Sequence, residues 1–229
     1  MRNTALNESF LKRFLRSRTT QGFTSAAIRV RDEWKLYRLD RRERKKSHRF
    51  LSSLPVKLHL GCGPNLKNGW VNIDLFDPGA DLRLDLREKW PFPDNSASYI
   101  YSEHVFEHFE YFVEVPHFLS ESLRVLQKGG VFDVGVPDTE WPLVAYCQPN
   151  DAYWKFSETI HPKEYETRLD HINYHFRQEG EHKYAWDKET LSKVLKASGF
   201  HSVTAREFDP ALDSETRRTG TIYMKAVKP

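Results

Sequence analysis

A glycine-rich turn follows the first strand-like segment of the chain. Alternating apolar residues over 56–60 predict a short strand, and Gly61 and Gly63 come directly after it. Glycines let the backbone turn sharply or approach a ligand closely. In an open α/β sheet such a turn lies at the carboxyl end of a central strand, where adenine-containing cofactors bind. The segment therefore predicts a site for the adenosine part of a cofactor.

The spacing of the next acidic residue argues against a dinucleotide. A dinucleotide fingerprint needs a third glycine, where this chain has Leu66, and an acidic residue about 20 residues further on. Asp74 comes only 74 − 61 = 13 residues after Gly61, at the end of the apolar run 70–74. A carboxylate at a strand tip accepts hydrogen bonds from both hydroxyls of a ribose. This arrangement favours a cofactor without phosphates.

Five motifs in a fixed order carry a resemblance to a known family. The chain has L-G-C-G at 60–63, an acid at Asp74, D-L at 85–86, S-E-H-V-F-E-H at 102–108 and L-Q-K-G-G at 126–130. Over about residues 55–136 it resembles the class I S-adenosylmethionine-dependent methyltransferases of the type 11-like group. It shares the short connection 61–70 with a subgroup that often looks like enzymes of polysaccharide biosynthesis.

The resemblance implies S-adenosylmethionine as the cofactor and assigns roles to individual residues. The turn 61–63 would contact the methionine and ribose portion, Asp74 would bind the ribose hydroxyls, and Asp85 with Leu86 would face the adenine. Residues 102–104 would close the site after a further strand. The implied cofactor-binding residues are Leu60, Gly61, Cys62, Gly63, Asp74, Leu75, Asp85, Leu86, Ser102, Glu103 and His104.

Two histidines of the S-E-H-V-F-E-H motif are candidates for catalysis. His104 would emerge beside the cofactor, and a neutral imidazole takes a proton from an attacking hydroxyl or amine. His108 is a weaker candidate, with a hydrogen-bonded structural role as the alternative. H-x-x-E-H is also a zinc-peptidase signature when both histidines lie on one helix. Because the methyltransferase motif already explains each position, we predict no metal site.

The segment 137–186 follows the fifth predicted strand and should determine acceptor choice. Its aromatic and titratable side chains favour stacking on a sugar or planar acceptor, with Trp141, His182 and Tyr184 as the candidate substrate-binding residues. The alternative is an aromatic cluster that packs a long loop. His171 and His175 are four residues apart and would suit a metal only if they are helical and joined by further ligands.

The order of the predicted elements indicates a Rossmann-like three-layer αβα sandwich. We expect a mostly parallel seven-stranded sheet with an antiparallel last strand, and a capped helix after Asp187. Only ten residues, 61–70, separate the first two strands, and a full crossover needs about a dozen. One sheet face should therefore lack a helix, and the N-terminal extension is the candidate to cover it. The predicted strands are 56–60, the one that follows 61–70 and ends at Asp74, 80–84, 97–102, 131–136, 203–208 and 221–227.

Charge divides the chain into a basic helical extension, 1–50, and a catalytic domain, 51–229, that includes the insertion 137–186. The 50 N-terminal residues hold fifteen Lys and Arg against five Asp and Glu, and the remainder has a net charge of 20 − 27 = −7. Residues 7–18 form an amphipathic basic segment suited to an anionic membrane surface, or to packing on the domain. The chain has no long apolar run and only two cysteines, which predicts a cytoplasmic protein with reduced thiols.

These observations predict a methyltransferase that acts on a small-molecule or saccharide acceptor. The subgroup resemblance favours O-methylation in glycan or polysaccharide biosynthesis. One alternative is an RNA methyltransferase that uses the basic extension as a phosphate clamp, although no RNA-binding module is recognisable. The other is a non-catalytic subunit that binds S-adenosylmethionine.

Overall fold

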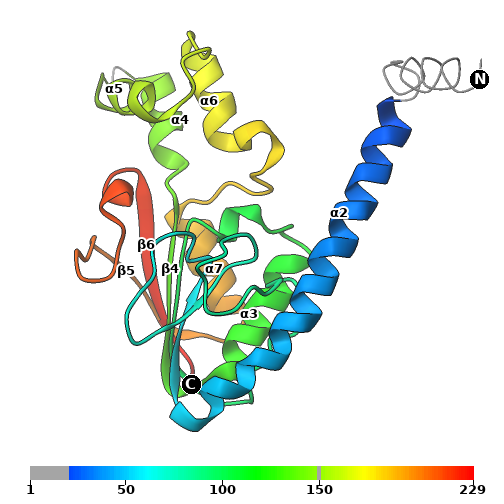
Figure 1. The fold of residues 1–229 in the computed structure, drawn as a ribbon. Helices are drawn as coiled ribbons and strands as arrows, with labels where there is room; N and C mark the ends of the chain where they lie inside the picture. The colour runs from blue at the N-terminus through cyan, green and yellow to red at the C-terminus, as the bar shows by residue number, and fades with distance from the viewer. Residues whose placement is uncertain (1–20, 149–150) are drawn as a thin grey trace, which may run out of the picture.

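The protein is built on one six-stranded mixed sheet. The computed structural model describes residues 21–148 and 151–229. The strand order is β2-β1-β3-β4-β6-β5, with β1 to β4 parallel and β6 antiparallel to both of its neighbours (Figure 1). The strands are β1 Val56–Leu60, β2 Val71–Ile73, β3 Ala97–Glu103, β4 Leu126–Pro137, β5 His201–Arg206 and β6 Thr221–Val227. The predicted Rossmann-like fold with an antiparallel last strand is confirmed.

The sheet has one strand fewer than predicted. Segment 80–84 makes only an isolated parallel bridge, between Leu82 and Ile73. Because β2 itself is only three residues long, it offers a short edge on which a further strand could pair. Leu82 and Leu84 are nevertheless buried, so the segment still contributes its apolar side chains to the core.

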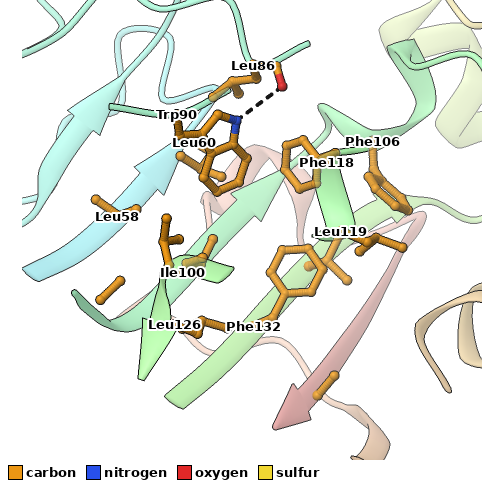
Figure 2. Packing of buried hydrophobic residues seen from close by; sticks show 14 of the residues in the cluster. Leu58, Leu60, Leu86, Trp90, Ile100, Phe106, Phe118, Leu119, Leu126 and Phe132 are labelled. Atoms are coloured by element: carbon orange, nitrogen blue, oxygen red, sulfur yellow. Dashed lines mark hydrogen bonds between the residues drawn. The ribbon is translucent and has the colours of Figure 1, made fainter. Parts of the chain in front are cut away.

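Two helices cover one face of the sheet. They are α3, Glu114–Val125, and α7, Lys188–Ala197, whose first turn is capped as predicted by Asp187. α3 ends at Val125, because Leu126 already begins β4. Figure 2 shows how rings from α3 and from the loops interdigitate with strand residues. The labelled core residues are Leu58, Leu60, Leu86, Trp90, Ile100, Phe106, Phe118, Leu119, Leu126 and Phe132.

The N-terminal helix packs on the side of the sheet that α3 already covers. α2, Gln21–Glu43, continues into the 3₁₀ segment η1, Arg44–Ser53. The carboxylate of Asp40 pairs with Arg44 and accepts the backbone N–H of Asp85 at 3.0 Å, and Arg44 also donates to the carbonyl of Lys89. The amino-terminal half of α2 projects away from the domain (Figure 1). The prediction that the extension covers the opposite face is therefore wrong for the part of the extension that the structure describes.

Loops and a polar network cover that opposite face among the described residues. His59, Tyr101 and Asp133 lie side by side on neighbouring strands. The Tyr101 hydroxyl donates to Asp213 at 2.9 Å, and Arg206 bridges the carboxylates of Asp213 and Asp133. The connection 207–220, which carries Asp213, thus takes the place of a helical layer. The short connection 61–70 is the reason, because it leaves no room for a crossover helix.

The insertion after β4 forms three short helices beyond the strand ends (Figure 1). They are α4, Glu140–Cys147, α5, Asp151–Ile160, and α6, Arg168–Arg177. Their buried side chains Ala145, Tyr153 and Trp154 form a small core of their own. The remaining 3₁₀ turns are η2 Phe106–His108, η3 Gln178–Gly180 and η4 Glu215–Arg217. No helix within 21–148 or 151–229 is both long and apolar enough to cross a membrane.

Burial of His59 makes stability depend on pH. Burial lowers the pKa of His59 from 6.5 to about 4, and the nearby charge of Lys67 adds to this effect. Below pH 6.5 the unfolded chain binds a proton at His59, whereas the folded chain does not bind it until about pH 4. The contribution of His59 to the free energy of unfolding is therefore fully present above pH 6.5 and is lost as the pH falls toward 4. We expect this site to remove up to about 3 kcal/mol from the free energy of unfolding. Urea denaturation from pH 8 to 5 should show a flatter pH dependence for His59→Gln; an unchanged slope would contradict this assignment.

Candidate active site

The turn after β1 can be built only with glycine at its first position. The N–H groups of Gly61 and Cys62 both donate to the carbonyl of Ile73, at 2.7 and 3.1 Å, which ties the turn to the end of β2. A Cβ on Gly61 would lie 2.0 Å from Cγ2 of Val105. Gly63 has a left-handed φ of 47°, but a Cβ there would have no atom within 4 Å. The turn is therefore closed on one side and open on the other.

Asp74 joins this turn to the end of β2. Its Oδ2 accepts the N–H of Gly63 at 2.9 Å, and its Oδ1 accepts the N–H groups of Phe76 and Asp77, both at 2.8 Å. Three of the about four lone-pair sites of the carboxylate are thus used, and the one that remains, on Oδ2, is available for a ligand hydroxyl. The carboxylate thus supports the turn and can also accept a hydrogen bond from one hydroxyl of a ribose.

A cavity of about 590 Å³ opens on the free side of the turn, a volume suited to a cofactor of nucleoside size. Asp74 and Asp85 line the same cavity, as a single nucleoside site requires. With the glycine cradle and the two carboxylates, these residues fit S-adenosylmethionine. The predicted residues that line this donor cavity are Gly61, Gly63, Asp74, Leu75, Asp85, Leu86 and His104.

Asp85 is held as an anion at the wall of the donor cavity. Burial opposes its charge, but hydrogen bonds and charge from Arg87 outweigh burial and hold the pKa of Asp85 below its ordinary value. Glu33 and Leu36 of α2 complete this wall of the cavity. Neither residue was predicted from the sequence to lie at the site. Their contribution depends on the docking of α2 through Asp40, for which the sequence carries no local signal.

A second cavity of about 560 Å³ adjoins the donor cavity and shares Gly61, Gly63 and His104 with it. The predicted cofactor residues Cys62 and Glu103 line this second cavity only. Its far wall is the segment 213–217, which was not predicted because it belongs to the loop that replaces a helix layer. Leu60 and Ser102 are fully buried in the sheet and line neither cavity.

Cys62 is a poor nucleophile in this position. Burial raises the pKa of its thiol to about 12, and the negative charge of Asp74 adds to the shift. Cys62 is buried and Cys147 exposed, and both thiols are free. Cys62 is therefore a small side chain in a tight turn.

His104 stands where the two cavities meet. Its backbone has a left-handed φ of 55°, and its N–H donates to the carbonyl of Gly135 at 2.9 Å. Nε2 lies 2.9 Å from Oγ1 of Thr221, and Nδ1 lies 3.5 Å from Oε1 of Glu107. Burial, followed by the charge of Arg217, lowers the pKa of His104 well below 6.5. The imidazole is therefore neutral at physiological pH, and one of its two ring nitrogens carries no proton.

The H-x-x-E-H segment does not form the helix that a zinc peptidase needs. Helix η2 begins only at Phe106, after the left-handed backbone of His104. His104 and His108 are therefore not stacked one turn apart on a helix face. His108 lines the donor cavity, with Nδ1 3.1 Å from the carbonyl of Glu181.

Of the three candidate substrate residues, only His182 lies near the two cavities. Its ring centroid is 5.2 Å from that of His108. Trp141 packs against Tyr153 in the small core of the insertion, and Tyr184 stacks on Tyr111 with a centroid distance of 4.1 Å. Neither Trp141 nor Tyr184 lines either cavity in this structure, and both rings pack against other aromatic rings.

The pair His171 and His175 is helical, since both lie in α6. Nδ1 of His171 faces Nδ1 of His161 at 2.9 Å. Within 21–148 and 151–229 these histidines belong to no group of three ligand atoms close enough for a metal ion. They are buried between the helices of the insertion.

Comparison with known proteins identifies the family of this chain. Residues 43–205 match the family model described as a methyltransferase domain. The chain is similar to the structure of an S-adenosylmethionine-dependent methyltransferase from Archaeoglobus fulgidus, at 15% identity and a TM-score of 0.48, covering 86% of this chain and 94% of that one. A counterpart from Mesorhizobium loti has 18% identity and a TM-score of 0.46, covering 80% and 97%. No curated protein matches the chain.

A third similar structure comes from Haloferax volcanii and is described as a complex between the Trm112 methyltransferase activator and a putative methyltransferase. Its identity to this chain is 17% and its TM-score 0.45, with 86% of this chain and 95% of that one covered.

The open side of the turn can be tested with two matched glycines. Gly63→Ala places a methyl group at the walls of both cavities, whereas Gly69→Ala imposes the same left-handed strain, at φ 77°, on an exposed residue that lines neither. Both variants should lose similar thermal stability, but only Gly63→Ala should bind S-adenosylmethionine more weakly, by about tenfold or more. Calorimetric titration measures this, and equal affinities would show that the cofactor does not approach Gly63.

The role of Asp74 can be separated from that of its neighbour. Asp74→Ala should weaken binding of S-adenosylmethionine by about 10- to 100-fold, the value of charged hydrogen bonds. Asp77→Ala is the control, because Asp77 caps an adjacent turn through the N–H of Gly79 and lines neither cavity. Both affinities can be measured by calorimetry on samples whose folding is verified by circular dichroism. Unchanged affinity in Asp74→Ala would exclude the ribose contact.

Proposed function

Since this chain belongs to the methyltransferase-domain family, we propose that it transfers a methyl group from S-adenosylmethionine to a hydroxyl of a small-molecule or saccharide acceptor. Methyltransferase activity and the cofactor follow from the family. The acceptor, the accepting oxygen and a place in glycan or polysaccharide biosynthesis are the proposed part.

One observation supports a polar acceptor: the donor cavity adjoins a second, polar cavity at His104. Lys67 and Glu103 line the second cavity with opposite charges. Burial raises the pKa of Glu103, although the hydroxyl of Tyr223 donates to its carboxylate at 2.8 Å. A wall of mixed donors and acceptors suits a molecule with many hydroxyl groups, such as a saccharide. It suits a phosphate backbone less well, which favours a uniformly basic groove.

The chain's own residues have three tasks in this reaction. The bound cofactor supplies an activated methyl group. Gly61, Gly63 and Asp74 hold the nucleoside, and the shared wall of the two cavities aligns acceptor and donor, which can supply a large share of the rate of such a displacement. His104 accepts the proton of the acceptor hydroxyl. The acceptor would approach Nε2 at the position where Thr221 now lies at 2.9 Å.

The basic N-terminal extension is the part of the chain that we expect to contact a membrane surface. Residues 7–18, which we expect to contact an anionic membrane surface, lie outside the described residues. The neighbouring helix α2 exposes Phe23, Val30 and Trp34. Exposed aromatic and aliphatic side chains next to basic ones support a peripheral contact of a cytoplasmic protein. Membrane contact and location thus remain part of the proposal.

The proposed base is tested by separating binding from turnover. His104→Ala should reduce methyl transfer by about 100-fold or more and should weaken binding of S-adenosylmethionine much less, because the lost imidazole is the proposed base. Thr221→Val should retain most of the transfer. The assay uses labelled cofactor with cell extract fractions and a saccharide panel, and His201→Ala, at an exposed position, is the control.

Undiminished transfer by His104→Ala would remove His104 as the base. Tight binding of S-adenosylmethionine without transfer to any fraction would favour a non-catalytic binding subunit. Transfer to RNA alone would overturn the proposed acceptor class and leave the methyltransferase assignment intact.

A further inference from the structure

Two segments far apart in the sequence bring three potential metal ligands together beside the donor cavity. Within 21–148 and 151–229, Glu107, His108 and His182 are the one group of three residues whose ligand atoms all lie within 4.8 Å of one another. The first two residues end η2, and the third lies in the connection between η3 and α7. The group is therefore a product of the tertiary structure.

The carboxylate of Glu107 is buried without a hydrogen-bond partner. The residue is 2% exposed, and neither side-chain oxygen makes a hydrogen bond. The nearest imidazole atoms to Oε1 are Nδ1 of His104 at 3.5 Å and Nε2 of His108 at 4.0 Å. A buried carboxylate without a partner costs several kcal/mol, so such a group takes up a proton, pairs with a cation or coordinates a metal. Burial raises the pKa of Glu107 to about 8, so the carboxylate holds its charge at neutral pH only with a cation beside it. Arg217 is the basic side chain whose charge interacts with the Glu107 carboxylate. It is exposed and makes no hydrogen bond to either carboxylate oxygen of Glu107.

The two imidazoles are oriented as metal ligands are. Nδ1 of His108 lies 3.1 Å from the carbonyl oxygen of Glu181, and Nδ1 of His182 lies 3.0 Å from that of His175. A carbonyl oxygen only accepts, so Nδ1 carries the proton in both rings and Nε2 keeps a free lone pair. Metal-binding histidines characteristically donate their other ring N–H to a carbonyl or carboxylate, which fixes the tautomer.

Backbone hydrogen bonds hold the two segments together. The N–H groups of Lys183 and Tyr184 both donate to the carbonyl of Glu107, at 2.8 and 3.2 Å. The ring of Tyr184 then stacks on Tyr111 at the edge of the main core. His182 is thereby placed beside Glu107 and His108 without needing an ion to draw it there.

We propose that Glu107, His108 and His182 bind a divalent transition-metal ion such as Zn²⁺ beside the donor cavity. Two imidazoles and one carboxylate favour zinc or a neighbouring transition metal over magnesium or calcium, which prefer oxygen ligands. Bonds of about 2.0–2.2 Å require the three ligand atoms to move inward by about 1 Å. Nδ1 of His104 faces the carboxylate from the other side and would orient it.

Three protein ligands leave open positions on such an ion. Because His108 lines the donor cavity and not the second cavity, the open positions of the ion would lie beside the bound methyl donor. A contact of the ion with the acceptor rests on the proposed function. The metal site itself rests only on the contacts of Glu107, His108 and His182.

The site is tested by zinc uptake of the whole chain. Protein freed of metal with a chelator is titrated with Zn²⁺ in a calorimeter, and retained zinc is counted by mass spectrometry after dialysis. We expect Glu107→Gln and His182→Asn each to bind one equivalent less than the parent, or to bind it at least tenfold more weakly. His201→Ala, at an exposed histidine, should bind as the parent does. Co²⁺ should show visible absorption bands of nitrogen and oxygen coordination in the parent and lose them in both variants.

The outcomes separate the metal site from a structural cluster. Glu107→Gln keeps the shape of a buried side chain and removes its charge, so the variant should remain folded, and Zn²⁺ should raise the melting temperature of the parent only. Equal zinc stoichiometry and affinity in the parent and both variants would overturn the proposal. Should Glu107→Gln fail to fold, His182→Asn decides by the same measurements.

Binding of S-adenosylmethionine is measured on the same samples. Cofactor binding without zinc uptake would overturn the metal site and leave the proposed function standing. Zinc uptake without cofactor binding would do the reverse.

Discussion

The close approach of three strand ends is the constraint on which the site depends. Gly61 after β1 lies against Val105 after β3 with no room for a Cβ, and its N–H is bonded to the end of β2. Asp74 then closes the arrangement by accepting the N–H of Gly63. Any side chain at Gly61 would push these strand ends apart. The donor cavity exists because the backbone turns away at Gly63, where nothing fills the space.

The short connection between β1 and β2 has effects across the sheet. It removes the crossover helix that would cover one face of the sheet. On that face the strands carry buried polar side chains that bond to one another and to the covering loop. Asp133 and Asp213 are buried on that face, and each carboxylate is paired with Arg206. A buried pair of this kind stabilises only because its hydrogen bonds are complete, with Tyr99 and Tyr101 supplying the remaining donors. The loop that carries Asp213 then becomes the wall of the second cavity.

The sequence was informative where function follows directly from a strand end. Gly61, Asp74 and Asp85 could be placed because each comes immediately after a strand-like segment, and strand ends of a parallel sheet meet at one edge. Segment 80–84 was predicted as a strand because its apolar residues alternate as those of a strand do. Whether it pairs depends on the length of the neighbouring strand β2, and the apolar pattern of 80–84 gives no information on that length. Trp141 was predicted to contact the acceptor from residue type alone.

Features that depend on distant partners could not be predicted in this way. Leu36 reaches the donor cavity only because Asp40 docks α2 on the backbone of Asp85. The sequence marks Glu107 only as the glutamate of the H-x-x-E-H pattern, and the pattern does not show that its oxygens are buried and unpaired. The sequence contains these residues, but their environments arise from contacts between residues that are 45 and 73 positions apart.

The insertion after β4 can vary without disturbing the sheet, because its two ends are fastened to each other. Asp138 and Trp186 form a parallel bridge, and the N–H of Thr139 donates to the carbonyl of Trp186 at 3.1 Å. Trp186 is fully buried and stacks on Phe106, so the return of the chain to the core is fixed. Only the last residues before this anchor reach the carbonyl of Glu107. Acceptor choice in this enzyme should therefore depend less on the helices α4 to α6 than on the few residues that connect η3 to Trp186.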